Sequence, residues 1–107
     1  MNKHYITPVL LLAFAVCLMM FSPASASEGK NVFISKCGSC HKAGGEAAAF
    51  APTKYASTQW DRFFERNKHE RKKDISSNVT EAEIAAVKTY LINHAADSDQ
   101  PEAVGLR

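Results

Sequence analysis

Cysteine and methionine are scarce in this 107-residue chain, and both are concentrated at its N-terminal end. Each occurs three times, and all of them except Cys37 and Cys40 lie within the first 20 positions. If that segment is removed, the remaining chain has no methionine and only two cysteines. Methionine is then excluded as a metal ligand, and a disulfide is excluded if both cysteines serve another purpose.

Strand patterns, internal repeats and a strong net charge are also missing. No stretch alternates apolar and polar residues as a half-buried strand would, so we expect an all-α domain. The net charge is +2, and it falls to +1 if Lys3 is removed. Such a weak charge gives no indication of nucleic acid or an anionic membrane as a partner.

The first 26 residues have the features of a secretory signal peptide. Lys3 supplies a positive charge near the start, residues 9–21 form an unbroken apolar run, and Ala24-Ser25-Ala26 is a small-residue cleavage site. We therefore expect cleavage near Ala26 and export to the periplasm.

Two alternatives to simple cleavage have less support. An uncleaved anchor would need an apolar run of roughly 18 residues or more, and this run is shorter. Lipoprotein processing at Cys17 would need a small residue before the cysteine, where the chain has Val16. We expect a single domain over residues 27–107, with no stable membrane span.

Cys37-Gly38-Ser39-Cys40-His41 is the motif from which we infer the chemistry. Its spacing fits covalent haem attachment, in which each sulfur forms a thioether with a vinyl group and the histidine binds the iron. A zinc site would need four N or S ligands, and the other histidines are too scattered to complete one. A thioredoxin-like redox pair would need a βαβ pattern, which the chain lacks. We therefore expect one covalent haem c, with its iron, as part of the core.

Three segments have helical periodicity. The first, residues 28–37, places Gly29, Phe33 and Cys37 on one face. We expect the second to begin at Thr58, which with Asp61 fits a capping pattern. The third follows a capping box at residues 80–83. Its apolar face consists of Ile84, Val87, Tyr90 and Leu91, and it ends near His94.

The segments between and after these helices have other compositions. Residues 42–57 contain turn residues and little periodicity, so we expect an irregular loop over one haem face. Residues 66–74 carry five Lys or Arg against two acids. Such a run is usually a solvated loop, although beside a haem edge it would attract an acidic partner. After Ala96 the polar composition predicts a tail that frays into solvent.

On these residues the chain resembles class I cytochromes c. Members of that family have a small residue, an aromatic residue and the first haem cysteine at the spacing of Gly29, Phe33 and Cys37. Their first and last helices cross closely at the small residue. The resemblance implies a small cytochrome c-like fold with three main helices around one covalent haem. It also implies that the Pro52 carbonyl accepts the Nδ1 proton of His41, with an ordinary turn proline as the alternative. The other residues expected to contact the haem are Phe33, Trp60, Phe64 and Leu91.

The chain departs from that family in lacking a methionine after residue 26 to bind the distal side of the iron. The alternatives are another ligand or an open position. A second resemblance, to the C-terminal haem half of the bacterial dihaem cytochrome c family, implies two histidine ligands, here His41 and His69. His94 is the other candidate, although its place at a helix C-terminus has an electrostatic explanation. The residues that carry the second resemblance are Cys37, Cys40, His41, Trp60, Phe64, His69, Tyr90, Leu91 and 95–97.

We therefore predict an electron-transfer protein, not an enzyme, with two histidines on the iron and a low potential. We expect redox proteins as partners, either one with an acidic face or a membrane cytochrome. The alternative is a gas-binding or sensing haem protein with an open or displaceable distal site.

Overall fold

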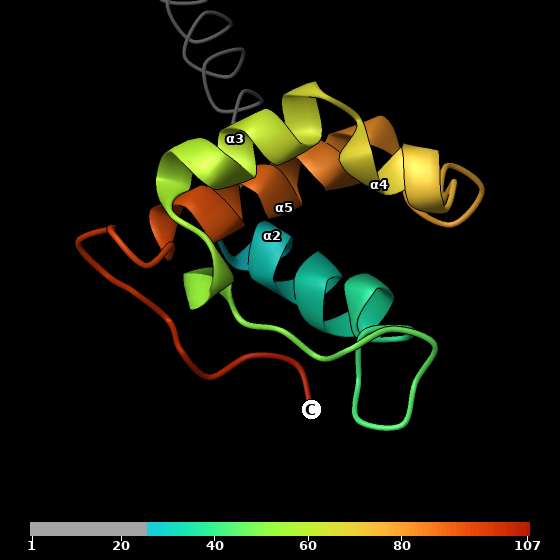
Figure 1. The fold of residues 1–107 in the computed structure, drawn as a ribbon, viewed down its shortest axis with the longest axis horizontal. Coiled ribbons are helices and arrows are strands. Elements are labelled where there is room, and N and C mark those ends of the chain that lie inside the picture. Colours follow the sequence, from blue (N-terminus) through green and yellow to red (C-terminus); the bar gives the residue numbers. More distant parts are fainter. Residues whose placement is uncertain (1–25) are drawn as a thin grey trace, which may run out of the picture.

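All regular elements in residues 26–107, the part of the chain that this computed structural model describes, are helical (Figure 1). The signal peptide predicted for residues 1–26 lies almost entirely outside this part. The elements in order are α2 (Ala26–Val32), the π-helical turn η1 (Phe33–Cys37), the 3-10 turn η2 (Pro52–Lys54), α3 (Ser57–Glu65), α4 (Lys68–Lys72) and α5 (Glu81–Asn93). Over residues 26–107 there is no β-strand, and a single bridge joins His41 to Ala47. The predicted all-α, cytochrome c-like fold is confirmed.

Helix α5 is the central element, because it packs against both α2 and α3 (Figure 1). It meets α2 at Gly29, which is buried. A β-carbon on Gly29 would lie 2.3 Å from the carbonyl oxygen of Ala86 and 2.8 Å from the Cβ of Tyr90. No side chain fits at this position, so the close crossing expected of the first and last helices is confirmed.

The core is apolar and rich in aromatic rings. Phe33 lies at its centre, with ring centroids 5.5 Å from Tyr90 and 5.2 Å from Phe50. The buried apolar residues are Val32, Phe33, Trp60, Val79, Val87, Tyr90, Leu91 and Ala95. None of the helices in the described part is long and apolar enough to cross a membrane.

Helices α3 and α5 are capped in different ways at their N-termini. For α5 the predicted capping box is confirmed, since the backbone N–H of Glu83 donates to Thr80 Oγ1 (3.1 Å) and that of Thr80 donates to the Glu83 carboxylate (3.0 Å). The predicted start of α3 at Thr58 is wrong, because the helix begins at Ser57. Both the backbone N–H and the hydroxyl of Ser57 donate to Asp97 Oδ1 at 2.8 Å. A residue beyond α5 therefore caps α3, which a local capping pattern does not reveal.

The C-terminal tail does not fray, contrary to the prediction from its composition. It turns back along the 42–57 loop (Figure 1), where the N–H of Leu106 donates to the carbonyl of Phe50 at 3.0 Å. The N–H of Glu102 donates to the carbonyl of His94 at 3.0 Å, and the Glu102 carboxylate accepts from the Tyr90 hydroxyl at 2.8 Å. These hydrogen bonds hold the tail against the rest of the domain despite its polar composition.

Candidate functional site

Cys37, Cys40 and His41 lie within a single turn at the end of η1. The N–H groups of Cys40 and His41 both donate to the carbonyl of Cys37, at 3.3 and 2.9 Å. All three side chains are half-buried. Burial raises the pKa of the Cys37 thiol to about 11. Burial thus disfavours the thiolate form of Cys37.

His41 is oriented by the loop that follows the motif. Its Nδ1 lies 2.9 Å from the carbonyl oxygen of Ala48, and its ring packs edge-on against Phe50 with centroids 4.9 Å apart. The loop is held by the N–H of Ala47, which donates to the carbonyl of Cys40 at 3.0 Å. Because a carbonyl oxygen only accepts, Nδ1 carries the proton and Nε2 has the lone pair that binds a metal.

The hydrogen-bond role predicted for Pro52 does not agree with the structure. Pro52 is fully buried, and its carbonyl accepts from Trp60 Nε1 at 2.8 Å. A buried indole N–H needs an acceptor, and the Pro52 carbonyl supplies it. The carbonyl of Ala48, closer in sequence to the motif, takes the place predicted for Pro52 beside His41.

His69 lies close to His41, although the two residues are far apart in the sequence. It lies in α4, and its Nδ1 is 2.9 Å from the carbonyl oxygen of Lys73. By the same reasoning its Nε2 is the free nitrogen. The two imidazole rings have centroids 6.1 Å apart and planes inclined at 63°.

This ring spacing fits one metal ion between the two imidazoles. A metal–imidazole bond is about 2 Å long and the nitrogen lies about 1 Å from the ring centroid, so two imidazoles on opposite sides of one ion have centroids about 6 Å apart. His41 and His69 would therefore hold the iron of a haem, and Cys37 and Cys40 would attach the haem covalently.

The predicted aromatic contacts form one cluster next to His41. The ring of Trp60 is buried and lies 5.7 Å from Phe50, 6.0 Å from Phe63 and 6.4 Å from Phe64. Phe33 and Leu91 are both buried in the adjoining core. The sequence prediction missed Phe50, which contacts His41, Phe33 and Trp60. The sequence does give an indication of this role, because Phe50 is the one aromatic residue in the alanine-rich residues 43–51, just after the motif.

His94, the other candidate ligand, has different neighbours. Its Nδ1 lies 2.8 Å from the carbonyl oxygen of Gln100, and its ring packs on Tyr90 with centroids 4.9 Å apart. The carboxylate of Glu102 is 4.0 Å from the same nitrogen. These contacts join α5 to the C-terminal tail, whereas His41 pairs with His69.

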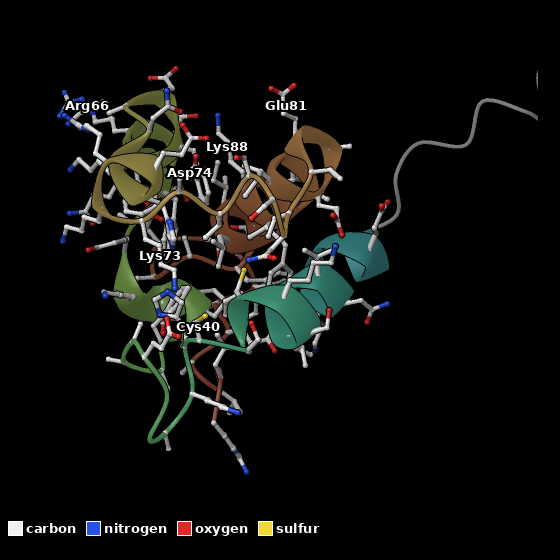
Figure 2. The ribbon with its side chains drawn as sticks, turned by 90° about the vertical axis from the view of Figure 1, so that its right-hand side faces the viewer. Cys40, Arg66, Lys73, Asp74, Glu81 and Lys88 are labelled. Atoms are coloured by element: carbon white, nitrogen blue, oxygen red, sulfur yellow. The ribbon has the colours of Figure 1, made fainter. Side chains whose placement is uncertain are left out.

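The basic run surrounds the segment that carries His69. Helix α4 has no buried residue. The exposed cations of the run are Arg66, Lys68, Arg71, Lys72 and Lys73. Figure 2 shows Arg66 projecting outward, and Lys73 below α4 on the same side as Cys40. Lys73 pairs with Glu46, and this contact raises the pKa of Lys73 and lowers that of Glu46.

Comparison with known proteins agrees with a haem site. Residues 24–91 match a family model described as cytochrome C oxidase, cbb3-type, subunit III. The match includes the haem motif and His69 and ends at Leu91. It supports a c-type cytochrome in general, and nothing in it points to the dihaem family in particular. Searches of curated proteins and of solved structures give no match.

A c-type cytochrome domain implies covalently bound haem c with its iron, so the cofactor prediction is confirmed. The same match supports a role in electron transfer. Since it covers more than half of the sequence, the chain belongs to the family of cytochrome c oxidase, cbb3-type, subunit III.

Proposed function

We propose that this protein is an exported, single-haem electron carrier whose iron is bound by His41 and His69. The observation that carries the proposal is the 6.1 Å separation of the two ring centroids. When bound, the haem supplies one-electron exchange between ferric and ferrous iron. His41 and His69 would hold the iron in both oxidation states, which suits electron transfer and would leave no open site for a substrate.

The protein contributes orientation and basicity to both ligands. The carbonyls of Ala48 and Lys73 accept the Nδ1 protons of His41 and His69. Such a hydrogen bond fixes the tautomer and makes the coordinating nitrogen more basic. A more basic ligand stabilises ferric iron, and methionine, which raises the potential of cytochromes, is absent after residue 26. We expect a potential below that of methionine-ligated cytochromes c.

The proposed location is the periplasm, reached through the signal peptide at residues 1–26. Lys3, the apolar run and the small residues before Ser27 support export. An extracytoplasmic location also agrees with the c-type cytochrome family.

The proposed partners are redox proteins with an acidic docking face. The basic surface, defined as Arg66, Lys68, Arg71, Lys72 and Lys73, is exposed beside His69. Complementary charge accelerates encounter and orients the partners, and the effect weakens as salt is added. The family name, that of an oxidase subunit, favours a membrane cytochrome or oxidase as electron acceptor.

One observation favours the alternative, a gas-binding protein. Helix α4, which carries His69, buries none of its residues, so the distal ligand is on a segment with few packing constraints. Carbon monoxide distinguishes the two functions. For a carrier, adding carbon monoxide to the reduced holoprotein at neutral pH causes no immediate shift of the Soret band. An immediate and complete shift would replace the electron-carrier proposal with gas binding.

A further inference from the structure

We propose that Glu46 and Lys73 form a positioning pair that holds His69 on the iron and sets how often the distal position opens. This inference rests on the proposed ligation by His69. It concerns two charged side chains that do not themselves touch the haem iron.

Lys73 is joined to His69 through its backbone. Its carbonyl accepts from His69 Nδ1 at 2.9 Å, and its N–H donates to the carbonyl of His69 at 2.7 Å. The orientation of the imidazole therefore depends on where Lys73 is held. The side chain of Lys73 forms an ion pair and hydrogen bond with Glu46 Oε2.

Glu46 belongs to the loop that orients the other ligand. Its neighbours hold the loop in shape, since the N–H of Gly45 donates to Lys42 at 2.8 Å and that of Ala47 donates to Cys40 at 3.0 Å. Two residues further on, Ala48 supplies the carbonyl that accepts from His41. The ion pair thus joins the two segments whose carbonyls orient the two imidazoles.

Few other contacts hold α4 to the loop on the opposite side of the site. The helix buries no residue, and it begins after Asn67, which has the left-handed backbone conformation (φ 48°, ψ 41°). Among the ion pairs and side-chain hydrogen bonds of residues 26–107, the Glu46–Lys73 contact is the only one that links a side chain of 67–73 to a distant segment. Figure 2 shows Lys73 near Cys40, whereas Arg66 projects at the outer edge of the molecule.

The size of the effect follows from the exposure of the pair. Both side chains are more than half exposed, at 56% for Lys73 and 70% for Glu46, so salt screens their attraction. Exposed pairs of this kind change an equilibrium by about two- to five-fold. We therefore expect a change in the rate of opening, with the six-coordinate ground state retained.

The test uses carbon monoxide as a probe of the reduced holoprotein in stopped-flow measurements. When an internal ligand must leave first, the observed rate of carbon monoxide binding reaches a limit at high carbon monoxide concentration. That limiting rate is the rate at which His69 leaves the iron. We expect Glu46→Gln to raise the limit about two- to five-fold, and the charge-exchanged double variant Glu46→Lys with Lys73→Glu to restore it. Added salt is expected to raise the wild-type limit and to leave that of Glu46→Gln unchanged.

Asp61→Asn is the matched control. It breaks a partly exposed ion pair with Lys88 (2.9 Å) that touches neither ligand segment, so the limiting rate is expected to stay at the wild-type value. An unchanged limit in Glu46→Gln, or an equal rise in Asp61→Asn, would overturn the positioning role while leaving His69 ligation intact. A wild-type rate that rises in proportion to carbon monoxide without a limit would instead overturn the ligation, and with it this inference.

Discussion

Gly29 lies so close to Ala86 that a β-carbon at position 29 would approach the Ala86 carbonyl oxygen to 2.3 Å. The obstacle is backbone, which cannot move aside as a flexible side chain can. Helices α2 and α5 are held at this distance over the core that contains Phe33 and Tyr90. Their crossing therefore determines how the haem motif, at the end of η1, sits relative to the rest of the domain.

We expect Gly29→Ala to destabilise the holoprotein by about 1–3 kcal/mol, the usual cost of overpacking. Alanine favours a helix over glycine by about 1 kcal/mol, which offsets part of the loss. Guanidinium denaturation followed by the Soret band measures the difference. Asn31→Ala, on the exposed side of the same helix, is the control and is expected to change stability little. Equal stability of Gly29→Ala and wild type would show that the helices do not cross this closely.

Trp60→Phe tests the hydrogen bond between the indole and Pro52. The substitution keeps an aromatic ring but removes the donor to the buried Pro52 carbonyl, which is 2.8 Å away. An unpaired buried polar group costs about 1–3 kcal/mol, so we expect a stability loss of that size, again measured by denaturation. The predicted haem ligation is independent of this bond, so the axial-ligand spectrum is expected to be unchanged. A variant as stable as wild type would exclude an important role for the bond.

Much of the fold can be predicted from the sequence because the determining signals are local. Periodicity places the first and last helices, the capping box at Thr80 fixes the start of α5, and the motif at residues 37–41 identifies the cofactor. The spacing of the aromatic residues and the histidines left after residue 26 also indicate His69 as a candidate ligand, and its ring lies near His41.

The features that could not be predicted depend on contacts between distant segments. Asp97 caps α3 from beyond α5, so the apparent local cap at Thr58 was misleading. Leu106 pairs with Phe50 across the domain, although the tail has the composition of a disordered end. The Ala48 carbonyl lies beside His41 and the Pro52 carbonyl beside Trp60, an arrangement of the loop that no local sequence pattern indicates.

Acid is expected to weaken the fold through three carboxylates whose pKa values lie below their ordinary values. The main cause in each case is a hydrogen bond to the carboxylate. The donors are Tyr90 for Glu102, the backbone of Ser57 for Asp97 and Lys36 for Glu83. A lowered pKa in the folded state means stability that is present above the unfolded-state pKa and is lost as pH falls through the folded-state value.

The denaturation midpoint of the holoprotein should therefore fall as the pH is lowered below about 4.5. Asp97→Ala should lower the midpoint at pH 7, because it removes the cap of α3, and should reduce the dependence on pH in the acid range. Midpoints measured between pH 3 and pH 7 provide the comparison. A pH dependence as steep in Asp97→Ala as in wild type would show that Asp97 makes no such contribution.

The basic surface can be tested without knowing the natural partner. We expect Lys72→Gln to slow electron exchange with the anionic oxidant ferricyanide several-fold at low salt, and the difference to disappear at high salt. Ala82→Glu changes the net charge by the same amount at an exposed position of α5 and should have a smaller effect. Equal slowing in the two variants would mean that only overall charge matters, and that electrons do not leave the protein beside α4.

The most direct test of the account is the axial ligation of the iron, read from the absorption and electron paramagnetic resonance spectra of the ferric holoprotein. We expect a low-spin, six-coordinate signal with two imidazoles in wild type, the same signal in His94→Ala, and a high-spin or replaced-ligand signal in His69→Ala. An unchanged low-spin signal in His69→Ala would contradict the assignment of His69 as the second ligand.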